Sequence, residues 1–250
     1  MPSYTTVGGR AIPNLRFGYE TYGRLNAAGD NAIFVLNLFT GTSHAAGKYQ
    51  ANDAAPGYWD GIIGSGKPID TDRFFVISAD ALANLNTRDP NVVTTGPSTI
   101  DAATGKPYGL SFPVVSYRDS VRVHKALLDA LGVKRLHAVV GASGGSIQAM
   151  EWGAAYPDFV QRIVHVIGPG FDITPFVIEM IDVWMTPIRL DPKCPRWGQR
   201  RDSLWTRRAF TRNVRARLVS DPYPRVSSAA TAGSVLPSRN SRNAPPAVEM

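Results

Sequence analysis

Apolar residues in the first two-thirds of the chain occur in short, nearly continuous runs separated by polar and glycine-rich segments. These runs cover residues 32–39, 73–78, 138–140 and 162–167. Runs of this length, bounded by turn residues, are typical of strands that are covered on both faces. Bulky and polar residues alternate from Leu15 to Gly23, which predicts one further, half-buried strand.

In several segments between or after these runs, apolar residues recur with the spacing of a helix. Residues 117–131 predict a helix that ends at Gly132, and a second helix follows Ser143 and stops at Tyr156-Pro157-Asp158. Residues 172–189 predict a third helix, which could begin a lid. Strands that alternate with helices predict an α/β fold with a mostly parallel, doubly wound sheet.

One of the predicted strands leads directly into Gly141-Ala142-Ser143-Gly144-Gly145, which fits the G-x-S-x-G pattern of a nucleophile elbow. A serine at a sharp strand-to-helix turn takes a strained backbone conformation, so residues without bulk are needed two positions to either side. Such a turn exposes the serine hydroxyl, and the following N–H points to the place where an oxyanion would form. The pattern therefore predicts Ser143 as a nucleophile and the α/β-hydrolase fold.

Charge is distributed unevenly along the chain. Residues 194–250 contain 11 Arg, no Lys and 3 acidic residues, whereas the preceding residues hold 16 basic and 17 acidic groups. We therefore predict a core over residues 1–193 and a basic tail over residues 194–250 that is disordered or read out of frame. A genuine basic tail that binds an anionic partner is the alternative. The nearly neutral core argues against specific nucleic-acid binding.

The composition argues against a membrane-spanning, secreted or disulfide-bonded protein. No apolar run is long enough to span a bilayer, and no secretory signal is visible at the N-terminus. The single cysteine, Cys194, excludes an internal disulfide and a multi-cysteine metal site. We expect a cytoplasmic protein without a metal or a bound cofactor.

Several separated motifs make the chain resemble the homoserine O-acetyltransferase family of α/β-hydrolase-fold acyltransferases. They are residues 19–26 (YETYGRLN), 39–44 (FTGTSH), 58–77 (YWDGIIGSGKPIDTDRFFVI), 96–100 (GPSTI), 104–109 (TGKPYG), 112–115 (FPVV), 118–119 (RD) and 148–152 (QAMEW). The resemblance implies that Ser143 takes an acetyl group from acetyl-CoA and passes it to an alcohol such as homoserine, a step in methionine biosynthesis. It also implies that the backbone N–H groups of Phe39 and Gly144 form the oxyanion hole, and that the intact protein can be a homodimer.

The chain also departs from this family. Phe39 stands where leucine is common, and Asn37 where histidine is frequent; residues 79–95 and 168–174 differ from the usual patterns as well. These departures favour a divergent branch with another alcohol or another acyl donor.

A catalytic serine needs a histidine that takes its proton and an acid that orients the histidine, in the chain order Ser, Asp or Glu, His. The only histidine after Ser143 is His165, inside a predicted strand, where a packing role is expected. We therefore predict a fold that lacks its C-terminal strands and a 250-residue chain with little or no acyltransfer activity. An esterase of the same fold and a non-catalytic fragment are the alternatives. Of the earlier histidines, His44 is expected to order the loop after residue 39.

Overall fold

The predicted strands form one five-stranded sheet. In the computed structural model, which describes residues 1–84, 86–168 and 175–190, the strand order is β11-β10-β4-β7-β3. The neighbours among β11, β10, β4 and β7 are parallel, and β3 is antiparallel to β7. The strands are β3 (Tyr19–Tyr22), β4 (Ala32–Leu36), β7 (Phe75–Ala79), β10 (Leu136–Ala142) and β11 (Ile163–Val166). The mostly parallel sheet predicted from the sequence is confirmed.

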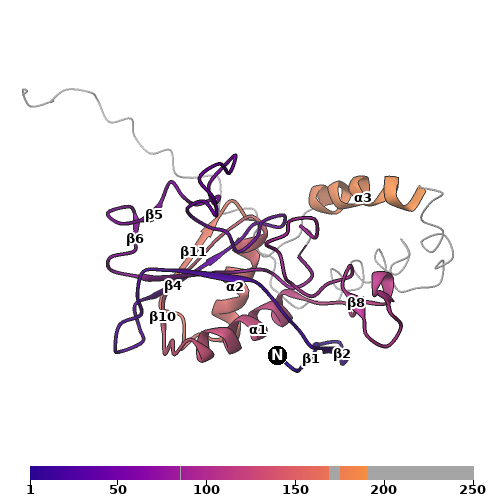
Figure 1. Cartoon of the computed structure of the whole chain (residues 1–250), viewed down its shortest axis with the longest axis horizontal. Coiled ribbons are helices and arrows are strands. Elements are labelled where there is room, and N and C mark those ends of the chain that lie inside the picture. Colours follow the sequence, from indigo (N-terminus) through magenta and orange to yellow (C-terminus); the bar gives the residue numbers. More distant parts are fainter. Residues whose placement is uncertain (85, 169–174, 191–250) are drawn as a thin grey trace, which may run out of the picture. The chain divides into compact units, whose positions relative to one another are not determined.

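Helices α1 (Tyr117–Ala130) and α2 (Gly144–Ala155) pack together against the sheet (Figure 1). Their contact with the sheet is an apolar core that includes Phe34, Leu128 and Trp152. Helix α1 begins at a capping box, in which Ser116 and Asp119 satisfy each other's backbone N–H groups. It ends before Gly132, whose φ of +82° is a conformation that glycine adopts without strain.

A second apolar core lies on alternate residues of the same strands. Ile33, Val35 and Val140 pack there against the long connection of residues 45–69. This connection contains the short parallel pair β5 (Ile63–Gly64) and β6 (Ile69–Asp70). Because both cores are built on β4 and β10, these strands are covered on both faces, as their continuous apolar runs predicted.

Small ribbons complete the first unit of the chain, residues 1–174. They are β1 (Ser3–Thr5) with β2 (Ala11–Pro13), β8 (Ile100–Asp101) with β9 (Lys106–Pro107), and the single turn η1 (Gly109–Ser111). Asp119 ties the N-terminal ribbon to α1, because its carboxylate accepts hydrogen bonds of 2.7 Å from the Tyr4 hydroxyl and the Val7 N–H.

Four of the predicted strands are shorter in the structure: those predicted over 73–78 and 162–167 differ by one or two residues, and those over 15–23 and 32–39 by more. The strand expected over residues 15–23 pairs only from Tyr19 to Tyr22, because the N–H groups of Arg16 and Gly18 donate instead to the hydroxyls of Thr95 and Thr94. The run over residues 32–39 ends its pairing at Leu36, where the chain turns toward the elbow.

Strand β11 is an outer strand within the described residues. Ile163 and Val164 are 39% and 44% exposed, although both are large and apolar. An outer strand with such residues is unusual, because sheet edges normally carry charged or polar side chains.

The second unit, residues 175–250, is described only through α3 (Pro175–Leu190). This helix confirms the one predicted over residues 172–189, of which residues 172–174 lie outside the described part. The predicted boundary near residue 193, the out-of-frame or basic tail and its anionic partner also lie outside the described residues. In the part of the chain that the structure describes, we find no helix with the length and apolar character needed to cross a membrane.

Candidate active site

Ser143 stands at a strained turn between β10 and α2. Its φ and ψ are 53° and −118°, a conformation that a residue with a side chain rarely adopts. The Ser143 N–H donates to the carbonyl of Val166 over 3.0 Å, and its own carbonyl accepts hydrogen bonds from the Ser146 N–H and hydroxyl. These bonds hold the turn from both sides, so the strain is maintained by the strand β11 and by the first turn of α2.

The two glycines of the motif allow the turn to close. A Cβ at Gly141 would lie 2.1 Å from the carbonyl oxygen of Gly145, and a Cβ at Gly145 would lie 2.6 Å from that of Leu36. Real Cβ atoms do not approach backbone so closely. The G-x-S-x-G spacing is therefore a steric requirement of this turn, as the sequence predicted.

The two predicted oxyanion donors lie next to each other. A Cβ at Gly144 would be 3.0 Å from the backbone nitrogen of Phe39. Gly144 opens α2, where N–H groups have no partner within the helix. The Phe39 N–H has no acceptor among the described residues. Two unpaired N–H groups beside a strained serine are the arrangement that stabilises a negatively charged oxygen.

The loop that carries Phe39 is held by side chains from the segment after β7. Asn84 donates to the carbonyl of Gly41 over 3.0 Å, and the Asp80 carboxylate accepts a 2.6 Å hydrogen bond from the Ser43 N–H. Desolvation of the buried Asp80 raises the pKa of its carboxyl. Asp80 and Asn84 thus hold the loop by hydrogen bonds to Ser43 and Gly41, while the Phe39 N–H has no acceptor among the described residues.

His44 ends this loop and is oriented by Glu20. Its Nδ1 lies 3.1 Å from a Glu20 carboxylate oxygen, and its ring stacks on Tyr49 with a centroid distance of 4.0 Å. Glu20 also accepts hydrogen bonds from the hydroxyls of Tyr22 and Tyr49. These contacts support the expected role of His44 in ordering the loop.

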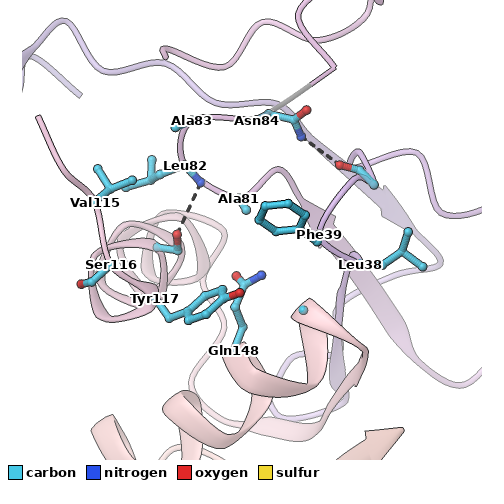
Figure 2. A pocket seen from close by; sticks show the side chains of 13 residues that line it. Leu38, Phe39, Ala81, Leu82, Ala83, Asn84, Val115, Ser116, Tyr117 and Gln148 are labelled. Carbon is cyan, nitrogen blue, oxygen red and sulfur yellow. Dashed lines mark hydrogen bonds between the residues drawn. The ribbon is translucent and has the colours of Figure 1, made fainter. Parts of the chain in front are cut away.

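A cavity of about 460 Å³ opens beside the two oxyanion donors (Figure 2). Its walls come from the Phe39 loop, the segment after β7, and the first turns of α1 and α2. Its lining includes the side chains of Phe39, Asn84, Ser116, Tyr117, Ser120 and Gln148. Since Phe39 and Gly144 both line it, a molecule in this cavity would lie beside both of these residues.

No histidine is hydrogen-bonded to the Ser143 hydroxyl within the described residues. His165 lies on β11 in register with Gly141 and is exposed. His124 is fully buried in α1, with Nε2 2.8 Å from the carbonyl oxygen of Asp80, and burial lowers its pKa to about 4. Among the described residues, no cluster of His, Cys, Asp or Glu could hold a metal ion.

Sequence analysis did not identify Asp80, Asn84 or Gln148 as parts of the site. Asp80 and Asn84 are ordinary polar residues in a long connection, and Gln148 appeared only within a motif of α2. The position of Asp80 at the carboxyl end of a predicted parallel strand, where α/β sheets place functional residues, was the one available signal.

The fold, the strained serine and the two neighbouring unpaired N–H groups define the class of protein. The family model of the alpha/beta hydrolase fold matches residues 54–234, so this chain belongs to the α/β-hydrolase fold family. Within that family the chain is similar to the homoserine O-acetyltransferases. It is 48% identical over 162 residues to the homoserine O-acetyltransferase of Symbiobacterium thermophilum, an alignment that covers 65% of this chain and 41% of that protein.

Two solved structures, one of a homoserine O-acetyltransferase and one of an esterase, are also similar to this chain. The structure of homoserine O-acetyltransferase from Bacillus anthracis superposes with a TM-score of 0.75 at 41% identity, over 81% of this chain and 54% of that one. The structure of esterase E22 superposes with a TM-score of 0.74 at 56% identity, over 77% of this chain and 52% of that one. The chain thus spans about half the length of the relatives it matches.

Proposed function

We propose that residues 1–190 form the nucleophile half of an acyltransferase that works through an acyl-Ser143 intermediate. The observation that supports this most directly is the contact between Gly144 and Phe39, which brings two free N–H groups together beside the strained serine. The similarity to homoserine O-acetyltransferases supports acetyl-CoA as the acyl donor and homoserine, or a related small alcohol, as the acceptor.

The reaction would proceed in two steps. The Ser143 oxygen attacks the thioester carbonyl carbon, the carbonyl oxygen takes negative charge between the Phe39 and Gly144 N–H groups, and the coenzyme A thiolate leaves and is protonated. The hydroxyl oxygen of the acceptor then attacks the acyl-serine carbonyl. Collapse of this second intermediate releases the new ester and returns the proton to Ser143. Both steps need a base, which an oriented histidine supplies in enzymes of this kind.

A hydrolytic function is the second candidate, because the identity to esterase E22, 56%, exceeds the 41% to the Bacillus anthracis acetyltransferase. In an esterase, water attacks the acyl-serine in place of the alcohol. The elbow and the oxyanion donors serve both reactions equally. The reaction that occurs therefore depends on whether the site binds an alcohol or admits water next to the acyl-serine.

The 250-residue chain itself is expected to be inactive. His165 is the only histidine after Ser143, and it lies on a strand in register with Gly141 rather than on a loop that faces the serine. Without a base, Ser143 remains a weak nucleophile. Acetyl-CoA or p-nitrophenyl acetate turnover by this chain that Ser143→Ala abolishes would contradict this proposal.

Two chimeras test the function itself. Residues 1–190 are joined to the C-terminal remainder of either the Bacillus anthracis acetyltransferase or esterase E22, so that a base and its acid are supplied. We expect both chimeras to release thiol from acetyl-CoA faster when homoserine is added. Ser143→Ala should abolish the release, and Ser98→Ala, at an exposed loop position, should leave it unchanged.

The opposite results are equally informative. Hydrolysis of p-nitrophenyl acetate by both chimeras, without any acetyl-CoA turnover, would favour the esterase. Folded chimeras, shown by circular dichroism and gel filtration, that catalyse neither reaction would overturn the proposal.

The remaining parts of the proposal concern the setting of the protein. We place the protein in the cytoplasm, in methionine biosynthesis, as a homodimer in its intact form, with acetyl-CoA as a co-substrate and no resident cofactor. Gel filtration of the chimeras tests the dimer, and growth of a homoserine acetyltransferase-deficient bacterium without methionine tests the pathway.

A further inference from the structure

Gln148 places an unsatisfied polar atom at the wall of the cavity. It lies about one turn beyond Gly144 in α2, and only 2% of the residue is exposed. Its side-chain oxygen Oε1 has no hydrogen-bond partner in the part of the chain that the structure describes. Gln148 nevertheless lines the cavity, and Figure 2 shows its side chain pointing into it. A buried acceptor without a partner is costly, and such groups are usually paired.

Three of the other polar side chains that line the cavity are engaged elsewhere, and no hydrogen bond joins any of them to Gln148 Oε1. Asn84 donates to the Gly41 carbonyl and accepts from the Asn86 N–H. The Ser116 hydroxyl is engaged with Asp119, and that of Ser120 accepts from the Leu82 N–H. Among the described lining residues, Gln148 Oε1 is thus a buried acceptor without a partner, whereas the Tyr117 hydroxyl is only partly buried.

The cavity also favours uncharged ligands. None of its described lining residues is Asp, Glu, Lys, Arg or His. Burial raises the pKa of the Tyr117 hydroxyl, so this group also stays neutral. An ammonium that entered would lose its hydration without gaining a charged partner, which is strongly unfavourable. A hydroxyl or an amide N–H can enter at little cost when it meets an acceptor.

We propose that Gln148 is a specificity-determining residue, whose Oε1 accepts a hydrogen bond from an uncharged N–H or O–H donor of the ligand bound in this cavity. The cavity therefore takes the neutral, amide- or hydroxyl-bearing part of a substrate and excludes ammonium groups. This inference rests on the proposed acyl transfer only in that the cavity shares Phe39 and Gly144 with the oxyanion hole.

Binding of matched probes to the 250-residue chain tests the inference without any need for turnover. Butanamide carries an N–H donor, 2-pentanone replaces that NH₂ by a methyl group, and n-butylammonium carries a charge. We expect butanamide to bind about ten times more tightly than 2-pentanone, as measured by ligand-detected NMR, because one hydrogen bond to a buried acceptor contributes a factor of this size. We expect n-butylammonium not to bind.

Gln148→Leu and Gln148→Met should remove the preference for butanamide over 2-pentanone. Gln50→Leu, at an exposed position, is the matched control and should retain it. The melting temperature separates binding from structure: removal of an unpaired buried group should leave it unchanged or raise it. A lowered melting temperature with an unchanged probe preference would assign Gln148 a structural role and overturn the inference.

Equal binding of butanamide and 2-pentanone to the unmodified chain, no binding of either probe, or binding of n-butylammonium would also overturn it. The probe preference and the acyl transfer of the chimeras are independent results. A chain that discriminates the probes, while its chimeras catalyse nothing, would support the role of Gln148 and contradict only the proposed acyl transfer.

Discussion

The Asp80 carboxylate accepts a 2.6 Å hydrogen bond from the backbone N–H of Ser43. This bond joins the end of β7 to the loop that presents the Phe39 N–H to the site. The second carboxylate oxygen accepts from the Thr94 hydroxyl over 2.6 Å, and the Asp80 carbonyl accepts from His124. One buried residue thus connects the oxyanion loop, the long connection after β7 and helix α1.

Asp80→Ala is expected to destabilise the chain by about 2–4 kcal/mol, because it leaves the Ser43 N–H and the Thr94 hydroxyl without their acceptor. Urea denaturation followed by tryptophan fluorescence measures the change. Asp158→Ala removes a carboxylate from an exposed position and should change the free energy of unfolding by less than about 0.5 kcal/mol. An Asp80→Ala chain as stable as the Asp158→Ala chain would contradict the assigned role.

Gly145→Ala is expected to cost about 2–4 kcal/mol of stability. The new Cβ would lie 2.6 Å from the Leu36 carbonyl oxygen and 2.7 Å from that of Asn37, and backbone of a central strand cannot move away easily. Gly61→Ala is the control, since nothing lies within 4 Å of a Cβ at that position. Thermal unfolding of the two variants should differ clearly; similar melting temperatures would show that the elbow is less tightly packed than described.

Ser143→Gly is expected to stabilise the chain by about 1 kcal/mol, because glycine adopts a φ of 53° without strain. Ser143→Ala removes the same hydroxyl but keeps the Cβ, so it should give little or none of this gain. The comparison of the two variants in urea therefore isolates the backbone strain at Ser143. A glycine variant no more stable than the alanine variant would mean that the turn stores no such strain.

His124 should make the chain sensitive to acid. Burial lowers its pKa from 6.5 to about 4 in the folded state, so the unfolded chain binds a proton first as the pH falls. The stability that the neutral His124 contributes is fully present above pH 6.5 and is lost as the pH falls from 6.5 to about 4. At pH 5 about 2 kcal/mol of this stability is lost.

His124→Gln should reduce the difference in unfolding free energy between pH 7.5 and pH 5 by about this amount, whatever its effect on stability at pH 7.5. His137→Gln, at a position that is only partly buried, should change the difference less. The prediction is wrong if the pH dependence of the His124→Gln chain equals that of the unmodified chain.

Much of the fold could be predicted from the sequence because its signals are local. The continuous apolar runs gave β4 and β10, since strands covered on both faces have no polar positions. The helical spacing up to Gly132 gave α1, because a positive φ at glycine ends a helix at low cost. The exact extent of β3 was not predictable, because it depends on the distant hydroxyls of Thr94 and Thr95.

For the site, the sequence by itself determined the nucleophile elbow, since the strain at Ser143 and the space around Gly141 and Gly145 arise within one turn. It also determined that His165 is the only histidine after the serine. Only the tertiary structure decided what surrounds this turn. The parallel pairing of β4 with β10 brings Phe39 to Gly144, and Asp80, Asn84 and Gln148 acquire their roles through contacts across the fold that no local pattern encodes.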